Sequence, residues 1–270
     1  MPDPLFDLTG RTIVITGGLG RLGRQFTLAC AQRGASVAIL DVTDDASRLA
    51  PFAEHADCVA LFKADLTSRE SVEQAHAKIV DRFGVPHGLV NNAGLDSPPD
   101  APAAETGPFE DYPDASWEKV LGVNLTGVFH ACQVIGGAMA REGRGSVINV
   151  SSIYGQVSPN QTIYDFRREA TGEAFFKPVA YSVSKSGLFN FTRYLATYWA
   201  PQKVRVNTVT FAGVFDNQPK EFLDAYLKLM PLGRMADPGE YNGAVVFLLS
   251  DASSYMTGSN LVMDGGWTAW

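Results

Sequence analysis

The stretch RTIVITGGLGRLG, residues 11–23, decides the fold of this chain. A strand-forming run leads directly into a turn with four glycines and then into a helical pattern of apolar residues. Gly17 would permit the sharp turn, Gly20 the close approach of a pyrophosphate, and Gly23 close packing of the helix on the strand. In isolation the same spacing also fits a turn that binds no ligand, so the rest of the chain must decide.

Short strand-like runs alternate with longer amphipathic segments along the whole sequence. After residues 12–16, strand-like runs lie at 36–41, 58–65, 88–94, 146–152, 204–210 and 260–266. Helical patterns lie at 22–33, 68–83, 114–141, 181–200, 217–229 and 238–250. This alternation predicts a doubly wound α/β Rossmann fold, with a mostly parallel seven-stranded sheet covered on both faces. Because no repeat or linker divides the chain, we expect a single domain over 1–270.

Two stretches break the alternation, the Pro-rich segment 95–113 and the polar segment 153–179. Both follow the carboxyl end of a predicted strand, where open α/β sheets bind their ligands. We therefore expect two substrate-side insertions that wall a pocket.

Composition narrows the ligand class. A formal net charge of −7 argues against nucleic acid or an anionic membrane surface, because phosphate binding needs clustered Lys and Arg. No apolar run spans a bilayer and the N-terminus is acidic, so a cytoplasmic protein with a small-molecule substrate is expected. The three cysteines and four histidines show no ligand spacing, which predicts no metal site.

The second strand-like run ends at Asp41, close to 20 residues beyond the glycine turn. A carboxylate there would accept hydrogen bonds from the adenosine ribose and repel a 2′-phosphate, which favours NAD over NADP. Arg21 and Arg24 argue the other way, because a guanidinium group can bind such a phosphate.

A series of motifs resembles the short-chain dehydrogenase/reductase family over essentially the whole chain. They are TGGLGRLG (16–23), Asp65 in KADLT, NNAG (91–94), Asn124 in VLGVNLTGVF, INVSS (148–152), YSVSK (181–185), VRVNTV (204–209) and TGSNLVMDGG (257–266). The resemblance implies cofactor contacts from Gly17, Gly20, Arg21, Leu22, Asp41, Asp65, Leu66, Asn91, Ala93, Gly94, Tyr181, Lys185 and Val214.

The candidate catalytic pair is Tyr181 and Lys185, four residues apart and hence on one helix face. A nearby ammonium group favours phenolate, so we expect Lys185 to lower the pKa of Tyr181 and make it a general acid/base. The family resemblance implies that Ser152 binds the substrate oxygen and that Asn124 supports a proton-relay water. Ser151 should point to the opposite face of its strand.

Three features depart from the usual family pattern. Arg21 stands where a glycine is common, and Phe211 with Ala212 replaces a Pro-Gly pair beside the nicotinamide. The gap between Ser152 and Tyr181 is unusually long. Substrate contacts in and around this gap are predicted for Ser152, Tyr154, Arg167, Arg168 and Lys177, the last three with an anionic group. Alternatively, these basic residues pair with acidic neighbours on the surface.

The sequence thus predicts an NAD-dependent oxidoreductase that interconverts a secondary alcohol and a ketone, or a sugar hemiacetal and a lactone. Resemblance to the branch around flagellin modification suggests a polyhydroxylated sugar or sugar acid. Alternatives are an apolar alcohol such as a steroid, a catalytically silent nucleotide-binding protein, and an epimerase or dehydratase with tightly held NAD. By resemblance, a homotetramer or homodimer is expected.

Overall fold

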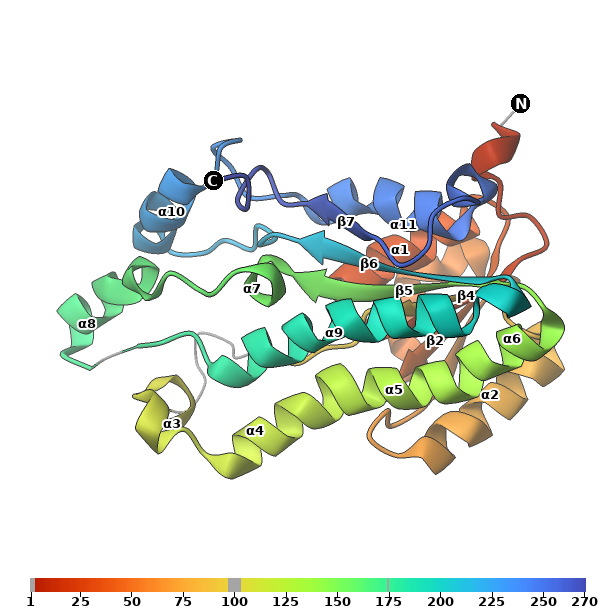
Figure 1. Ribbon diagram of the computed structural model, residues 1–270, viewed down its shortest axis with the longest axis horizontal. Helices are drawn as coiled ribbons and strands as arrows, with labels where there is room; N and C mark the ends of the chain where they lie inside the picture. The colour runs from red at the N-terminus through yellow and green to blue at the C-terminus, as the bar shows by residue number, and fades with distance from the viewer. Residues whose placement is uncertain (1–2, 97–102, 174) are drawn as a thin grey trace.

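Seven strands form one parallel sheet in the order β3-β2-β1-β4-β5-β6-β7 (Figure 1). The structure, a computed structural model, describes residues 3–96, 103–173 and 175–270. The strands are β1 (Thr12–Thr16), β2 (Ser36–Asp41), β3 (Val59–Lys63), β4 (Gly88–Asn91), β5 (Gly145–Ser152), β6 (Val204–Phe211) and β7 (Asn260–Met263). The predicted α/β Rossmann fold is confirmed.

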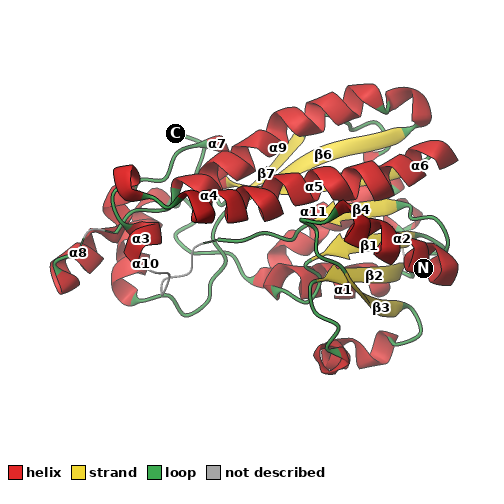
Figure 2. Ribbon diagram, turned by 90° about the horizontal axis from the view of Figure 1, so that it is seen from below, coloured by secondary structure: helices red, strands yellow, loops and turns green. Residues whose placement is uncertain are grey.

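Helices cover both faces of the sheet, with α1 and α11 on one face and α2, α9 and the run α4 to α6 on the other (Figures 1 and 2). The helices are α1 (Arg21–Ala31), α2 (Arg69–Phe83), α3 (Ala103–Thr106), α4 (Asp114–Leu121), α5 (Gly127–Ala131), α6 (Gly137–Glu142), α7 (Ile153–Gln156), α8 (Asp165–Thr171), α9 (Val179–Tyr198), α10 (Lys220–Tyr226) and α11 (Asn242–Leu249).

The core follows from the alternation of side chains along the strands. Ile13 and Ile15 of β1 pack under α1 and α11, whereas Val14 packs on the opposite side. All three side chains are fully buried. Strands buried on both faces explain why the strand-like runs are almost continuously apolar.

One continuous helix runs from Asp114 to Glu142, with π-helical turns at 122–126 and 132–136 between α4, α5 and α6. By length and composition alone this helix could cross a membrane. Its apolar side packs on the sheet through Val128, Ile135 and Met139, so burial in the core accounts for its composition.

The segment 153–179 folds into α7, a 3₁₀ turn at 161–164 and α8. Together with α10 it builds a separate apolar cluster beyond the sheet. Trp267 belongs to this cluster and stacks on Tyr226, with ring centroids 4.4 Å apart. Trp267 is therefore buried within its own chain, whereas Trp270 is exposed.

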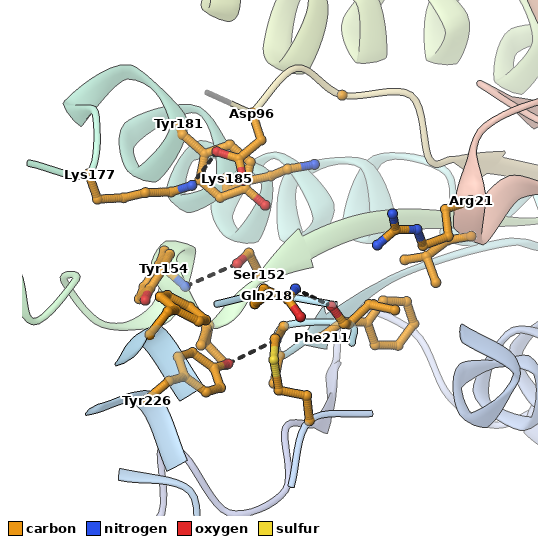
Figure 3. Close-up of a pocket in the computed structure, with 18 of the residues that line it drawn as sticks. Arg21, Asp96, Ser152, Tyr154, Lys177, Tyr181, Lys185, Phe211, Gln218 and Tyr226 are labelled. Atoms are coloured by element: carbon orange, nitrogen blue, oxygen red, sulfur yellow. Dashed lines mark hydrogen bonds and ion pairs between the residues drawn. The ribbon is translucent and has the colours of Figure 1, made fainter. Parts of the chain in front are cut away.

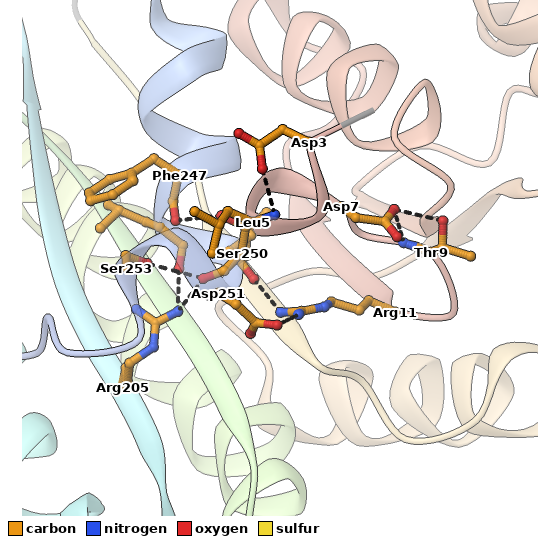
Figure 4. Close-up of polar contacts among 12 residues, drawn as sticks. Asp3, Leu5, Asp7, Thr9, Arg11, Arg205, Phe247, Ser250, Asp251 and Ser253 are labelled. Carbon is orange, nitrogen blue, oxygen red and sulfur yellow. Dashed lines mark hydrogen bonds and ion pairs between the residues drawn. The ribbon is translucent and has the colours of Figure 1, made fainter. Parts of the chain in front are cut away.

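Two arginines at the amino-terminal ends of β1 and β6 hold the C-terminus of α11 (Figure 4). Arg11 donates to the carbonyl of Leu249 at 2.9 Å and pairs with Asp251 at 2.8 Å. Arg205 donates to the carbonyl of Leu248 at 2.7 Å. Because both arginines meet the C-terminus of α11, where carbonyl groups lack helical partners, their role is structural.

Candidate active site

A cavity of about 590 Å³ lies beyond the carboxyl ends of β4, β5 and β6 (Figure 3). Ten of the predicted site residues line it: Arg21, Leu22, Gly94, Ser152, Tyr154, Arg167, Lys177, Tyr181, Lys185 and Val214. This is the edge at which open α/β sheets bind ligands. Residues predicted for the cofactor and the substrate are therefore brought together at one place.

The glycine turn is closed by backbone contacts that only glycine allows. Gly17 has φ +62°, and a Cβ atom there would lie 2.9 Å from the Cα of Ala93. At Gly23 a Cβ atom would lie 2.2 Å from the carbonyl oxygen of Gly17. Gly20 precedes α1, and no side chain caps this helix end. The N-terminus of α1 thus suits an anion such as a pyrophosphate.

Asp41 ends β2 beside this turn. Its carboxylate accepts hydrogen bonds from the backbone N–H groups of Val42 at 2.9 Å and of Leu19 at 3.3 Å. Arg24 donates to the carbonyl of Leu19 at 2.8 Å, and Arg21 forms an ion pair with Asp216. Both arginines that argued for NADP therefore have partners within the protein, and Arg21 links the turn to the loop after β6.

The two asparagines of the NNAG motif point to different places, Asn91 into the core and Asn92 toward the glycine turn. Asn91 is buried and its side chain donates to Asn149 at 2.8 Å, so its predicted cofactor contact stays a prediction. Neighbouring residues of a strand point to opposite sides, and Asn92 is the one that lines the cavity. Asn92 donates to the carbonyls of Thr16 and Gly17 at 3.0 and 3.2 Å. The sequence analysis missed Asn92.

Ser152, Tyr181 and Lys185 meet at the centre of the cavity (Figure 3). Ser152 lies close enough to Tyr181 to lower the pKa of its phenol, and its Oγ accepts from the N–H of Tyr154 at 3.2 Å. Lys185 Nζ donates to the carbonyl of Val150 at 2.9 Å and lies 5.9 Å from the centroid of the Tyr181 ring. Ser151 instead donates to the carbonyl of Lys185 at 2.8 Å. Ser152 is therefore the serine that faces Tyr181.

The protonation of this group differs from the expectation. Burial raises the pKa of Tyr181, Asp96 raises it further, and the hydrogen bond with Ser152 lowers it. Burial also lowers the pKa of Lys185 to about 8. The pKa of Tyr181 is thus raised and not lowered, because the cost of burying a phenolate dominates. The effect of Lys185 on Tyr181 stays a prediction.

Asn124 lies fully buried in the first π-helical turn of the long helix. Its amide donates to the carbonyl of Leu95 at 2.9 Å and to Ser184 at 3.0 Å, and its Oδ1 accepts from the N–H of Leu95 at 2.7 Å. The Asn124 side chain therefore fixes the chain that leaves β4. The predicted relay water stays a prediction.

Of three other predicted cofactor residues, Val214 lines the cavity, whereas Asp65 and Leu66 do not. Asp65 is exposed and accepts from the N–H of Thr67 at 2.9 Å, whereas Leu66 is buried. The carbonyl of Val214 accepts from Gln218 at 2.9 Å. The departure at 211–212 is accommodated by Tyr241, which stacks on Phe211 at 4.0 Å between ring centroids and donates to the carbonyl of Ala212 at 3.0 Å.

The long segment brings two of its three basic residues to the cavity. Lys177 forms an ion pair with Asp96, and its Nζ lies 5.0 Å from the centroid of the Tyr181 ring. The guanidinium carbon of Arg167 lies 4.5 Å from the centroid of the Phe175 ring. Asp96, which the sequence analysis missed, therefore faces the catalytic residues.

Arg168 was wrongly predicted to bind substrate. It does not line the cavity, its side chain is exposed, and it pairs with Asp165 at 3.5 Å on the surface of α8. On a helix the adjacent Arg167 and Arg168 project in different directions, and only Arg167 meets the cavity. The surface-pair alternative holds for Arg168.

Aromatic side chains form much of the cavity wall, and of these only Tyr154 was predicted from the sequence. They come from α7, the 3₁₀ turn, α8, the loop after α8, and α10: Tyr154, Tyr164, Phe166, Phe175, Phe222 and Tyr226. Burial raises the pKa of Tyr154 and raises that of Tyr164 to about 12. Both phenols therefore stay protonated at neutral pH and can act as hydrogen-bond donors.

Two family models match the chain, one described as short chain dehydrogenase over residues 11–165 and one as enoyl-(acyl carrier protein) reductase over residues 168–268. An NAD-dependent glycerol dehydrogenase of Listeria innocua is 30% identical, with 98% of this chain and 97% of that protein covered. A 3-alpha-(or 20-beta)-hydroxysteroid dehydrogenase of Mycobacterium bovis is 32% identical, with 97% and 91% covered.

Among solved structures, a short chain dehydrogenase of Leptospira borgpetersenii with bound NAD⁺ is 31% identical. It superposes with a TM-score of 0.82, and 99% of this chain and 96% of that chain are covered. The matches extend over the glycine turn, the central serine, tyrosine and lysine, and the last strand. The chain therefore belongs to the short-chain dehydrogenase/reductase family of oxidoreductases.

Proposed function

We propose that this protein is an NAD(H)-dependent oxidoreductase that interconverts a secondary alcohol and a ketone, or a sugar hemiacetal and a lactone. The observation that carries the proposal is the meeting of Ser152, Tyr181 and Lys185 in one cavity beside a glycine turn suited to a pyrophosphate. The intact catalytic set argues against a catalytically silent nucleotide-binding protein.

The residues of the chain divide the chemistry between them. When bound, NAD supplies the hydride acceptor and, in its oxidised form, a positive charge. Tyr181 removes the proton of the substrate hydroxyl during oxidation and returns it during reduction. Ser152, which lines the same cavity as Tyr181, holds the substrate oxygen next to the phenol. Because burial raises the pKa of Tyr181, proton removal needs nearby positive charge, which Lys185 provides in part.

NAD is the proposed cofactor in preference to NADP. The Asp41 carboxylate lies beside the turn, where it would accept from ribose hydroxyls and repel a 2′-phosphate. Arg21 and Arg24 are engaged with Asp216 and Leu19. The glycerol dehydrogenase relative is NAD-dependent, and the Leptospira relative was solved with NAD⁺.

The proposed substrate is a polyhydroxylated or acidic sugar-like alcohol. The glycerol dehydrogenase relative acts on a polyol, and Lys177 and Arg167 bring positive charge to the cavity. The aromatic distal wall favours a second candidate, an apolar alcohol, and a steroid dehydrogenase is among the relatives.

We also propose a cytoplasmic homotetramer or homodimer. Its support is a set of large apolar side chains exposed on α5 and α9: Phe129, Val183, Tyr194 and Tyr198. Such clusters on a globular protein mark interaction surfaces.

The test is a spectrophotometric screen of polyols, sugar acids, steroids and simple alcohols with NAD⁺ and NADP⁺. We expect reduction of NAD⁺ by at least one class, at a higher kcat/KM for NAD⁺ than for NADP⁺. A protein that binds NADH but neither oxidises an alcohol of any class nor reduces any ketone would contradict the proposed activity. A preference for NADP⁺ would contradict only the cofactor assignment.

A further inference from the structure

We propose that Lys177 determines the substrate specificity of this cavity by binding a carboxylate that lies a few bonds from the reacting hydroxyl. The inference rests on the proposed oxidoreductase function and names its substrate class, hydroxy acids and the matching keto acids, in place of neutral polyols or steroids. In the protein without substrate, the carboxylate of Asp96 holds the same ammonium group (Figure 3).

The fold fixes Lys177 next to the reacting group. The side chain of Lys177 is only 9% exposed, and Nζ lies 5.0 Å from the centroid of the Tyr181 ring. Gln161 holds the Lys177 backbone from both sides, accepting from its N–H at 2.8 Å and donating to its carbonyl at 3.4 Å. The preceding N–H, of Phe176, donates to the carbonyl of Thr106 at 2.7 Å. The long segment thus places an ammonium group close to the site of proton transfer.

Asp96 marks the position of the anion. Asn124 fixes the backbone of Leu95, which places Asp96 at the cavity wall. There its carboxylate pairs with Lys177 and raises the pKa of four neighbours: Tyr154, Tyr164, Tyr181 and Lys185. An anion at this point therefore meets the ammonium group of Lys177, a donor suited to a carboxylate ligand, in a cavity that Lys185 and the three phenols also line.

Asp96 and Lys177 differ in exposure, so a substrate carboxylate can replace that of Asp96 at the ammonium group of Lys177. The Asp96 side chain is 50% exposed, so it can turn toward water, whereas Lys177 remains buried. An exposed carboxylate gains little from an ion pair in comparison with its hydration. A substrate carboxylate that reaches Lys177 from within the cavity would replace it or share the ammonium group, which has three donors.

The charge of the cavity lining agrees with an anionic ligand. Among the described residues, four basic side chains line the cavity, Arg21, Arg167, Lys177 and Lys185, against one acidic side chain, Asp96. Arg21 is balanced by Asp216, which leaves three basic side chains against Asp96. The chain as a whole carries a net charge of −7. The cavity is thus more positive than the rest of the molecule, and a neutral polyol or steroid gives no reason for this local excess of positive charge.

The experiment compares carboxylates with their neutral amides, which have nearly the same shape. Propionate, butyrate and cyclohexanecarboxylate, each beside its amide, are titrated calorimetrically into the full-length protein with NADH present. The variants are Lys177→Met, Lys177→Arg and Asp96→Asn. Arg168→Met is the matched control, because it removes a positive charge from the same segment but outside the cavity. Circular dichroism checks the fold of each variant.

The wild-type protein is expected to prefer the carboxylates. Lys177→Met should weaken carboxylate binding about tenfold to a hundredfold, the loss of one charged hydrogen bond, and Lys177→Arg should restore most of it. Asp96→Asn should act in the opposite direction and strengthen carboxylate binding about twofold to fivefold. Arg168→Met should keep the wild-type preference.

A carboxylate preference that survives Lys177→Met would overturn the proposal. If Lys177→Met and Asp96→Asn weaken the binding of carboxylates and amides equally, the ion pair is structural and the proposal is wrong. The proposal is also wrong if neither the wild-type nor the Asp96→Asn protein binds any carboxylate of the series. The proposed function fails separately. A protein that binds carboxylates at Lys177 but oxidises no alcohol or hydroxy acid would contradict the oxidoreductase activity alone.

Discussion

The cofactor side and the substrate side of the cavity are built from different materials. On the cofactor side, the shape of the turn depends on close backbone contacts. The backbone of Gly17 approaches Ala93, and that of Gly23 approaches Gly17, too closely for a Cβ atom on either glycine. On the substrate side, side chains from distant segments meet, as Asp96 and Lys177 do. Backbone contacts demand glycine at fixed spacing, which is visible in a sequence. Contacts between distant side chains leave no such pattern.

The backbone side is expected to fail abruptly. In Gly23→Ala the new Cβ atom would lie 2.2 Å from the carbonyl oxygen of Gly17, so the turn must open. We expect NADH binding to weaken at least about a hundredfold and the free energy of unfolding to fall by about 1–3 kcal/mol. Gly243→Ala is the control, because a Cβ atom there meets nothing within 4 Å. Fluorescence titration with NADH and urea denaturation measure both effects, and wild-type NADH affinity in Gly23→Ala would contradict this account of the turn.

Lys185, which lies beside Tyr181 in the cavity, should make the free energy of unfolding depend on pH. Burial lowers the pKa of Lys185 from 10.5 to about 8. Between these values the unfolded chain holds a proton that the folded protein has released, so the free energy of unfolding rises with pH. Relative to Lys185→Met, the wild type should gain up to about 1.4 kcal/mol per pH unit between pH 8 and pH 10. Urea denaturation of both proteins across this range tests it, and a constant difference would contradict the buried, weakly basic ammonium group.

A smaller change should separate the two cofactors. Asp41→Ala removes the carboxylate that would repel a 2′-phosphate, so the ratio of kcat/KM for NADP⁺ to that for NAD⁺ should rise about tenfold or more. Asp44→Ala is the matched control, because Asp44 lies three residues further on and pairs with Lys63 at 3.2 Å. Steady-state kinetics with both cofactors decide, and an unchanged ratio in Asp41→Ala would refute the role given to Asp41.

The smallest effect is expected at Arg168, on the surface of α8. Because its ion pair with Asp165 is exposed, Arg168→Met should change the free energy of unfolding by no more than about 0.5 kcal/mol. Thermal denaturation measures this. A loss of more than about 2 kcal/mol would show that α8 depends on this pair, contrary to the structure.

The predictability of the site follows the same division. Tyr181 and Lys185 were identified because an i, i+4 spacing is a local pattern, whereas the role of Ser152 followed from the family resemblance. Asn92 was missed in favour of Asn91, since two adjacent asparagines differ only in which side of the strand they face. Asp96 was missed because its partner, Lys177, lies 81 residues along the chain. The pKa of Tyr181 was misjudged because burial, which raises it, is a property of the folded protein.

The fold was largely predictable because the seven strands are short runs rich in β-branched residues and are separated by helical segments. The segment 153–179 was less so. Its helices α7 and α8 are only four and seven residues long, too short for a clear periodic pattern, and the cluster with α10 and Trp267 stabilises α7.

The central claim, that the two sides meet at Tyr181 as the acid/base group of an NAD-linked reaction, is tested most directly by Tyr181→Phe. This substitution removes one hydroxyl group and leaves the glycine turn intact. Rates of NAD⁺ reduction are measured with the best alcohol of the screen, beside the affinity for NADH. We predict a fall in kcat of about 10²- to 10⁴-fold at unchanged NADH affinity. Turnover of Tyr181→Phe at the wild-type rate would contradict the claim.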